Sequence, residues 1–471
     1  MDKYAQFKEH ISHCLERFKE IDRRETIRLV SHLDADGISS CSLMVKALNT
    51  DSRKYSLSIV QSLNEDVIKE LAREPYQYFV FTDLGSGVLS LLNKYLADRQ
   101  VYVLDHHEIE DCKVHSHISH VNPHLFGIDG GKEISGAGVV FLFVRSLSKK
   151  LDDVAHIAMI GATGDMQEDG NGFLTLNKEI LDVAVASGKL TVSRGLRIFG
   201  AQTRPLHKVL EYCTDPFIPG VSGSESGTIQ FLNEIGIGAK NGDGWRKIVH
   251  LDTEELQNLV SGIIVRRMGE DRPEDVLGNV YILNDEEKES PFRDIKEFST
   301  LLNACGRMDN ATLGIGACLG DPKTKEKALK NLLSYKRLIM ESMRWFESQS
   351  DGSSVKRGEG YIIINAEDQV KASIIGTMAS ILSKSNDMKK GTLILSLADL
   401  LDGKYKVSLR VCGSADVDLR LLATQMASAV GGEAGGHEYA AGAIIDEDKV
   451  TAFLEEAEKI LVKRGMEEII R

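Results

Sequence analysis

The stretch SHLDADG, residues 31–37, follows directly on the short apolar run TIRLV (26–30) and decides the fold class. The same arrangement recurs where YFVF (78–81) leads into TDLGSG and where VYVL (101–104) leads into DHHE. Each run has the length and the β-branched or aromatic content of a buried strand, and helix-compatible sequence separates the runs. This alternation predicts an α/β domain with a mostly parallel sheet over residues 1–190. Ligands of such sheets bind beyond the carboxyl ends of the strands, where these polar clusters lie.

Two further regions follow along the chain. Helical patterns dominate residues 191–347, including 251–268 and an apolar stripe within 325–347, and predict a helical middle segment. The polar stretch SQSDGSSVKRGEG (348–360) has the composition of a linker. Candidate strands YIIIN (361–365), TLILSLA (392–398) and YKVSLRV (405–411) then predict a smaller C-terminal α/β domain over 348–471.

The composition sets limits on the function. Apolar residues make up 42% and charged residues 27% of the 471-residue chain, which is typical of a soluble globular protein of two or three domains. No apolar run is long enough to span a membrane and no signal peptide is evident, so we expect a cytoplasmic protein. The seven scattered cysteines contain no C-x-x-C pair, which argues against disulfides and structural zinc. A net charge of −13 argues against non-specific coating of DNA, although bound cations can still attract phosphates.

Carboxylates and histidines gather after the strand-like runs and after the apolar stretch VAHIAMIGATG (154–164). They are His32, Asp34, Asp36, Asp83, Asp105, His106, His107 and Asp165. A lone Asp after a strand is usually a turn or N-cap residue, and a lone His pair is usually structural. Five carboxylates meeting at one sheet edge would, however, repel one another unless divalent cations compensate them. Oxygen and imidazole donors suit Mn²⁺ or Mg²⁺, and five acids exceed the needs of one ion. The pattern therefore predicts two ions about 3.5–4 Å apart, an arrangement suited to phosphoester hydrolysis.

The C-terminal region offers a second group of candidates. Ser408 and Arg410 alternate onto one face of the strand-like run 405–411, and GGEAGGHEYAAG (431–442) contains Gly435, Gly436 and His437. A planar Arg can hold a phosphate with two hydrogen bonds, and glycines permit close backbone approach to an anion. The alternatives are a surface strand charge for Arg410 and a simple turn for the glycines.

The order of these motifs resembles the DHH family of phosphoesterases. Asp-Ala-Asp-Gly, an Asp after the second strand, Asp-His-His and a later Gly-x-x-x-Asp, over roughly residues 25–170, are similar to the four motifs of that family. SHVNPH (119–124) and ISGAGVVF (134–141) are similar to the stretch between motifs three and four of RecJ-type members. GGHEYAAG with the preceding strand resembles the DHH-associated domain, over about 346–471.

The resemblance implies a role for each residue. Asp36, Asp83, Asp105 and Asp165 would hold the metals, with Asp83 bridging, while Asp34 and His32 would join one ion and His106 the other. His107 would contact the scissile phosphate, so that Asp34 and His107 are the catalytic candidates beside the metal ligands. Ser408, Arg410, Gly435, Gly436 and His437 would bind substrate. In small-substrate members the first His lies four residues before the first Asp, whereas His32 lies two before Asp34. This spacing leaves a ligand role and a bystander role open for His32 and favours the nuclease branch.

Three functions follow from this resemblance. The first is a RecJ-like exonuclease on single-stranded DNA, 5′→3′, with RNA as a second substrate, using two divalent ions, Mn²⁺ or alternatively Mg²⁺. The helical block at 191–347 is similar to that of archaeal RecJ-like proteins, which implies the GINS complex and the replisome as partners. The second is a short-oligonucleotide or cyclic-dinucleotide phosphodiesterase, although such relatives lack this block. The third is a non-catalytic replisome scaffold, which the intact acidic positions disfavour.

Overall fold

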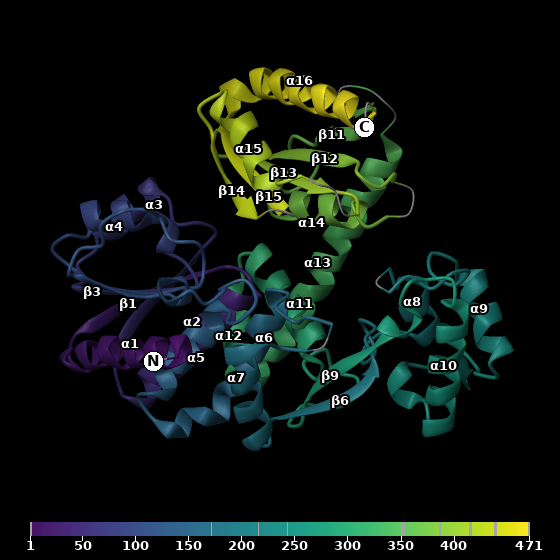
Figure 1. The fold of residues 1–471 in the computed structure, drawn as a ribbon, viewed down its shortest axis with the longest axis horizontal. Coiled ribbons are helices and arrows are strands. Elements are labelled where there is room, and N and C mark those ends of the chain that lie inside the picture. Colours follow the sequence, from purple (N-terminus) through teal and green to yellow (C-terminus); the bar gives the residue numbers. More distant parts are fainter. Residues whose placement is uncertain are drawn as a thin grey trace. The chain divides into compact units, whose positions relative to one another are not determined.

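The computed structural model describes residues 2–170, 172–214, 216–242, 244–349, 352, 354–385, 388–413, 417–437 and 440–469. The chain forms two compact units, Met1–Asn331 and Leu332–Arg471. The two large sheets belong to different units, a parallel five-stranded sheet to the first and a mixed six-stranded sheet to the second (Figure 1). The α/β class, with an N-terminal parallel sheet, a helical middle and a C-terminal sheet domain, is confirmed.

The parallel sheet of the first unit has the strand order β2-β1-β3-β4-β5. Its strands are β1 (Thr26–His32), β2 (Lys54–Val60), β3 (Tyr78–Thr82), β4 (Gln100–Leu104) and β5 (Ile118–Val121). The predicted runs 26–30, 78–81 and 101–104 are the three inner strands, and almost all of their side chains are buried. Because every pairing is parallel, the carboxyl ends of β1, β3 and β4 meet at one edge.

Three buried helices pack against one another beside this sheet: α2 (Ala35–Thr50), α5 (Gly136–Arg145) and α6 (Ala155–Gly164). Small and apolar residues occupy nearly every side of α2 and α5, as expected of helices with no exposed face. The apolar stretch 154–164 noted in the sequence forms the helix α6 from Ala155 onward. The other helices around the sheet are α1 (Lys3–Lys19), α3 (Glu65–Ala72), α4 (Leu89–Tyr95), α7 (Thr175–Ala186), α11 (Ile295–Arg307) and α12 (Ala311–Cys318), with the 3₁₀ helices η1 (Ser86–Val88), η2 (Pro123–Phe126) and η3 (Lys149–Val154).

Residues 196–277, called the middle lobe below, have an apolar core of their own. Leu206 and Leu210 of α8 pack there with Phe231 of α9 and with Leu259 and Ile263 of α10. The antiparallel pair β6–β9 joins this lobe to the rest of the unit. The elements are β6 (Leu190–Leu196), α8 (Leu206–Glu211), α9 (Glu225–Glu234), β7 (Lys240–Asn241), β8 (Gly244–Trp245), η4 (Ile248–His250), α10 (Thr253–Arg266), η5 (Pro273–Val276) and β9 (Leu277–Leu283).

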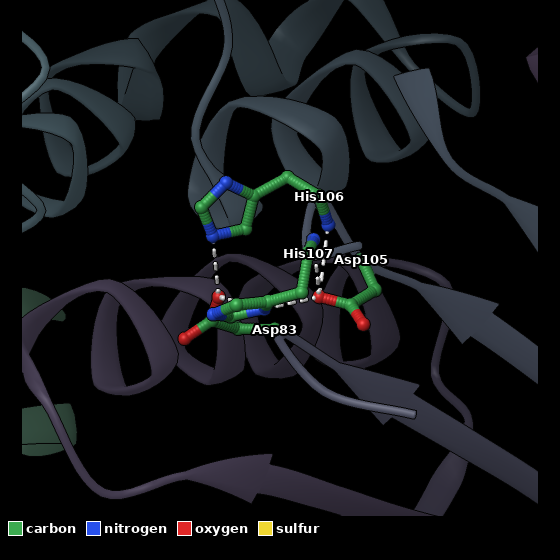
Figure 2. Close-up of side chains that lie close together, drawn as sticks. All are labelled: Asp83, Asp105, His106 and His107. Atoms are coloured by element: carbon green, nitrogen blue, oxygen red, sulfur yellow. Dashed lines mark hydrogen bonds and ion pairs between the residues drawn. The ribbon is translucent and has the colours of Figure 1, made fainter. Parts of the chain in front are cut away.

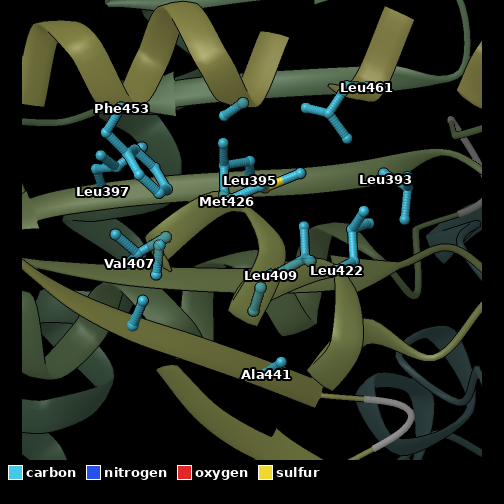
Figure 3. Close-up of a cluster of buried hydrophobic side chains, with 14 of the residues drawn as sticks. Leu393, Leu395, Leu397, Val407, Leu409, Leu422, Met426, Ala441, Phe453 and Leu461 are labelled. Atoms are coloured by element: carbon cyan, nitrogen blue, oxygen red, sulfur yellow. The ribbon is translucent and has the colours of Figure 1, made fainter. Parts of the chain in front are cut away.

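The second unit is built on a sheet of order β10-β11-β12-β13-β15-β14, in which only β11 and β12 are parallel. Alternate residues of β12 and β13, among them Leu395 and Leu409, face a core completed by Met426 of α15 and Phe453 of α16 (Figure 3). The elements are α13 (Pro322–Ser348), which begins in the first unit, β10 (Val355–Gly358), β11 (Tyr361–Asn365), α14 (Ala372–Leu382), β12 (Leu393–Asp399), β13 (Lys404–Val411), α15 (Leu419–Ser428), β14 (Glu433–His437), β15 (Ala440–Asp446), η6 (Glu447–Lys449) and α16 (Val450–Ile469).

The prediction that residues 348–360 form a linker is wrong for Val355–Gly358. Val355–Gly358 forms the edge strand β10, which pairs antiparallel with β11. Only Val355 of this strand is buried, and the next three residues are exposed. A strand with one buried side chain has no periodic pattern, so its polar composition gave no strand signal.

Candidate metal centre

The carboxylates and histidines predicted from the sequence meet at the carboxyl edge of the parallel sheet. Asp34 and Asp36 follow β1, Asp83 follows β3, and Asp105 follows β4. Asp165 comes from the end of α6, where it is the C-cap residue. The packing of α6 against α2 therefore adds a fifth carboxylate to a site that three strands begin.

Donor atoms of these residues form three groups, each with all of its atoms within 4.8 Å of one another. The groups are Asp83 with Asp105, His106 and His107; His32 with Asp34 and Asp83; and Asp36 with His106 and Asp165. Asp83 belongs to the first and second groups and His106 to the first and third, so the three groups form one connected site. All eight residues named from the sequence are thereby brought together.

Asp83 is held at the middle of the site in a strained conformation. Its backbone φ is 59°, in the left-handed region, which costs of the order of 1–3 kcal/mol for a non-glycine residue. Its side chain is 1% exposed, yet neither carboxylate oxygen accepts a hydrogen bond from a described residue. Gly136 leaves the space that this carboxylate occupies, because a Cβ there would lie 2.3 Å from Asp83 Oδ1. A buried carboxylate without donors fits a cation ligand.

Asp36 receives the N-terminus of helix α5. The amides of Gly136 and Ala137 donate to its two oxygens at 2.7 and 3.0 Å. Burial, and then the negative charge of Asp83, raise the pKa of Asp36 well above its usual range. Burial and Asp83 also raise the pKa of Asp165, against the opposing effect of His106. The site thus carries more negative charge than its protein surroundings balance.

His106 has the hydrogen bond that a metal-binding histidine needs. Its Nδ1 lies 2.7 Å from the carbonyl oxygen of Gly130, which assigns the ring proton to Nδ1 and leaves Nε2 as an acceptor. Nε2 is buried and lies 3.2 Å from Asp83 Oδ1 (Figure 2). It also lies 3.6 Å from Asp36 Oδ2 and has no hydrogen-bond partner among the described residues. Burial lowers the pKa of His106, but contact with Asp83 and the charges of Asp165 and Asp36 outweigh it and raise the pKa well above its usual range. The carboxylates therefore favour a positive charge at this nitrogen, which a proton or a metal ion can supply.

Asp105 and His107 form a hydrogen-bonded pair beside Asp83 (Figure 2). His107 Nδ1 lies 2.8 Å from Asp105 Oδ1, and the amide of Ser86 donates to Asp105 Oδ2 at 2.9 Å. Burial raises the pKa of Asp105, but the charges of His107 and His106 and the Ser86 amide outweigh it and lower the pKa well below its usual range. Burial lowers the pKa of His107, whereas Asp105 raises it to about 8. His107, with 36% of its side chain exposed, can thus hold or release a proton near neutral pH.

His32 lies with the other donors despite its short spacing from Asp34. Its Nδ1 is 3.0 Å from Asp34 Oδ2 and 3.6 Å from Asp83 Oδ2. Asp34 is the N-cap of α2 and accepts from the amide of Gly37 at 2.9 Å. Burial raises the pKa of Asp34, but His32 and the Gly37 amide lower it far below its usual range. A bend at the strand end lets residues 32 and 34 face the same point, which the spacing alone does not reveal.

Two residues that orient the donors were not among the predicted site residues, although Asn122 lies in the segment SHVNPH (119–124) quoted above. Gln167 donates from Nε2 to Asp165 Oδ2 and to the Gly130 carbonyl, both at 2.7 Å. It thereby links Asp165 to the carbonyl that His106 also contacts. Asn122 donates to Ser86 Oγ at 2.8 Å and to the His107 carbonyl at 2.9 Å. Buried polar residues of this kind fix the direction of the ligands around a metal.

The candidates in the second unit lie on neighbouring strands. Ser408 of β13 is opposite Gly442 of β15, which is in turn opposite Gly435 of β14, so these three residues form one row across the sheet. Gly435 has open space where a Cβ would stand, whereas Gly436 has φ 130° and a Cβ there would lie 2.5 Å from the Ala440 carbonyl oxygen. The row is therefore open at Gly435, whereas Ser408 is buried. The side chain of His437 lies outside the described residues.

Arg410 has partners within its own unit, unlike the unpaired surface charge considered above. Its Nε donates to Ser380 Oγ at 2.8 Å, and Nη1 donates to the carbonyls of Leu409 and Ala441 at 2.8 and 3.2 Å. Ser408 and Arg410 both lie beside Gly376 of α14, on the face opposite the Leu409 core. The guanidinium is thus oriented by the protein rather than mobile.

The donor set fits divalent ions well. Five carboxylates, three imidazoles and the unpartnered oxygens of Asp83 are the oxygen and nitrogen donors that Mn²⁺ and Mg²⁺ accept, and the groups contain no thiolate. Asp83 contributes donor atoms to two of these groups. Such a centre is suited to hydrolysis of phosphate esters.

Three family models match the chain: the N-terminal domain of the DHH family at residues 26–163, the DHH-CID domain at 198–280 and the DHHA1 domain at 358–463. An uncharacterized protein of Methanocaldococcus jannaschii, MJ0831, is 31% identical over 445 residues, which is 92% of this chain and 93% of the relative. The fold and the site are those of a phosphoesterase of the DHH type, and the chain belongs to the DHH family.

Within the family the chain is RecJ-like in fold. RecJ from Thermus thermophilus, solved with Mn²⁺, has a TM-score of 0.58 at 16% identity, covering 96% of this chain and 55% of its own. This chain thus spans about half the length of that protein. CDC45 from Entamoeba histolytica has a TM-score of 0.66 at 12% identity, covering 97% and 99%. None of the described helices has both the length and the apolar content needed to cross a membrane.

Proposed function

We propose that the protein is a metal-dependent exonuclease that hydrolyses single-stranded DNA, in the 5′→3′ direction, with RNA as a second substrate. Two divalent ions, Mn²⁺ or alternatively Mg²⁺, are its proposed cofactors. The observation that carries the proposal is Asp83, a buried carboxylate with no hydrogen-bond donor among the described residues that is shared by two groups of ligand atoms. The fold likeness to RecJ supports a nuclease over other phosphoesterases.

In this proposal the eight residues of the centre divide into ligands and proton carriers. His32, Asp34 and Asp83 would hold one ion, and Asp36, Asp105, His106 and Asp165 would hold the other with Asp83 between them. The bound ions would supply a water of lowered pKa and would neutralise the phosphoryl oxygens. His107, whose pKa is raised to about 8, would contact the scissile phosphate and donate a proton to it or to the leaving oxygen. Asp34, whose pKa is far below its usual range, would remain a carboxylate throughout.

The second unit would bind the nucleotide. Its proposed residues are Ser408, Arg410, Gly435, Gly436 and His437. The contacts of Arg410 with Ser380 and the backbone fix its orientation in advance, and its guanidinium would add an anion to them. The open backbone at Gly435 allows a phosphate or sugar to approach closely.

The second candidate function is a non-catalytic scaffold, which the fold likeness to CDC45 supports. Residues 191–347 would then contact replisome proteins such as GINS. The complete set of acidic residues favours an enzyme, because an inactive protein gains nothing from buried carboxylates that repel one another. The experiment that separates the two is hydrolysis of end-labelled single-stranded DNA and RNA with Mn²⁺, with Mg²⁺ and with EDTA.

Release of mononucleotides from one end, only with a divalent ion, is the expected result, and the labelled end reports the polarity. The Asp83→Ala variant serves as the inactive control. Cleavage confined to dinucleotides would indicate a short-oligonucleotide phosphodiesterase. Equal cleavage by wild type and Asp83→Ala, or no cleavage with any ion, would refute the proposed activity.

A further inference from the structure

Three exposed aromatic side chains lie next to the short helix α8 of the middle lobe. Phe199 is 38% exposed, Tyr212 57% and Trp245 45%. Tyr212 is the C-cap residue of α8. Trp245 contacts the same helix through the ring of His207, whose centroid lies 4.0 Å away. Exposed aromatic rings gathered around one helix mark a binding surface more often than scattered rings do.

Cations without ion-pair partners among the described residues accompany these rings. Arg204 Cζ lies 4.9 Å from the ring centre of Phe199 and 6.0 Å from that of Tyr212, and Lys240 Nζ lies 4.5 Å from that of Trp245. Neither Arg204 nor Lys240 has an ion pair or a side-chain hydrogen bond to another described residue. The Glu297 carboxylate acts on Arg204 from beyond ion-pair distance. On a chain with a net charge of −13, cations without an ion pair beside exposed rings point to an anionic ligand.

The loop that carries Phe199 and Arg204 is fixed in place. The amide of Gln202 donates to Glu297 Oε1 at 2.9 Å, and the hydroxyl of Thr203 donates to the other oxygen of the same buried carboxylate. Glu297 belongs to α11, whose Asn303 accepts from the amide of Ala35 at 3.0 Å, one residue from Asp34 and Asp36. The aromatic surface and the metal centre are therefore both hydrogen-bonded to α11.

We propose that Phe199, Arg204, Tyr212, Lys240 and Trp245, called the aromatic platform, bind single-stranded nucleic acid. Bases would stack on the three rings, and Arg204 and Lys240 would turn to the phosphates between them. A duplex is excluded as the ligand because its bases already stack on one another and expose no face to a side chain. This proposal rests on the proposed function. It adds a region outside the metal centre that binds the nucleic-acid strand.

Tryptophan fluorescence tests the platform directly, because Trp245 and Trp345 are the two tryptophans of the sequence. The Trp345→Phe variant leaves Trp245 as the reporter, and Trp245→Phe leaves Trp345. Each full-length variant is titrated with oligothymidylate in EDTA, so that binding is measured without cleavage. Saturable quenching in Trp345→Phe and none in Trp245→Phe is expected. Quenching confined to Trp245→Phe would overturn the proposal.

Side-chain variants give a second, independent measurement. Phe199→Ala and Tyr212→Ala should each weaken oligothymidylate binding at least about fivefold, the lower end of the range for one lost base–aromatic stack. Lys240→Gln should make binding less sensitive to salt. Lys323→Gln, an exposed lysine of α13 outside the lobe, is the matched control and should bind like wild type. Wild-type affinity in both aromatic variants would overturn the proposal and assign these rings to a protein contact.

A small substrate separates the platform from the proposed function. Bis(p-nitrophenyl) phosphate has one phosphodiester and no base, so its Mn²⁺-dependent hydrolysis by wild type reports the metal centre alone. Hydrolysis of this ester without quenching of Trp245 would refute the platform and leave the phosphodiesterase standing. Quenching of Trp245 without hydrolysis of any substrate would refute the enzyme and leave a nucleic-acid-binding protein.

Discussion

The Asp83→Asn substitution should stabilise the protein in EDTA and remove the stabilisation that Mn²⁺ provides. The wild-type carboxylate is buried without a donor among the described residues, and its charge raises the pKa of Asp36 and of Asp165. Asn has nearly the same shape, tolerates the left-handed backbone at φ 59°, and its amide oxygen can accept from protonated His106 Nε2, which is 3.2 Å from Asp83 Oδ1. The substitution therefore removes the repulsion between Asp83 and the neighbouring carboxylates without a change in packing.

The expected difference in the free energy of unfolding between Asp83→Asn and wild type follows from two opposing terms. An unpartnered buried polar group costs about 1–3 kcal/mol, so Asp83→Asn should gain about that much in EDTA. At a Mn²⁺ concentration about 100 times the Kd, an ion that binds only the folded wild type contributes about 2.7 kcal/mol. The variant lacks the shared ligand and should gain little of this. The order of stability of the two proteins should therefore reverse between EDTA and Mn²⁺.

Urea or thermal unfolding in EDTA and in a Mn²⁺ series measures both terms. Asp111→Asn, which removes an exposed carboxylate from the same unit, is the control. It should change neither the stability in EDTA nor the stabilisation by Mn²⁺. A variant less stable than wild type in EDTA would refute the reasoning about repulsion. Equal stabilisation of both proteins by Mn²⁺ would refute the assignment of Asp83 as a ligand.

Three further predictions concern other parts of the chain. Arg410→Ala should raise KM for oligonucleotide hydrolysis about tenfold with little change in kcat, since a charge-assisted hydrogen bond is lost, and steady-state kinetics with a wild-type KM would contradict this. Gly136→Ala should weaken Mn²⁺ binding at least about tenfold in titration calorimetry, because the new Cβ displaces the Asp83 carboxylate. An unchanged Mn²⁺ affinity would contradict this displacement. Burial raises the pKa of Asp294 from 3.8 to about 6, so wild type loses stability as the pH rises from about 4 to 6 and does not regain it above. Asp294→Asn keeps an N-cap side chain and should be more stable by up to about 3 kcal/mol at pH 7, at roughly 1.4 kcal/mol per pKa unit, and no more stable at pH 4, as urea unfolding would show.

The inner strands could be predicted because they are buried on both faces. β1, β3 and β4 read as continuous apolar runs, and each is followed at once by the polar residues that lie beyond its end. β2 and β10 could not be predicted in the same way. β2 was not among the predicted runs, although its sequence KYSLSIV alternates polar and apolar residues as a half-exposed strand does, whereas β10 buries only Val355 and shows no period.

The candidate site could be assembled from the sequence because its residues follow regular elements. The orientation of each side chain could not be predicted in this way. Gln167 touches both Asp165 and the Gly130 carbonyl, which are two and 37 residues away, and no spacing indicates the longer contact. Phe199 was identifiable as an aromatic residue but not as an exposed one, since its exposure depends on the fold of the loop anchored to Glu297.

The backbone of Asp83 also bears on how this family diverges. A buried carboxylate at φ 59° that accepts no hydrogen bond from a described residue lowers the stability of any descendant that no longer uses the metal centre. Once selection for activity ends, replacement by Asn removes the charge, and replacement by Gly removes both the charge and the strain. Position 83 is therefore the site at which lineages that have become binding proteins should first differ from those that remain enzymes. A survey of the aligned residue at this one position would sort uncharacterised relatives before any assay is made.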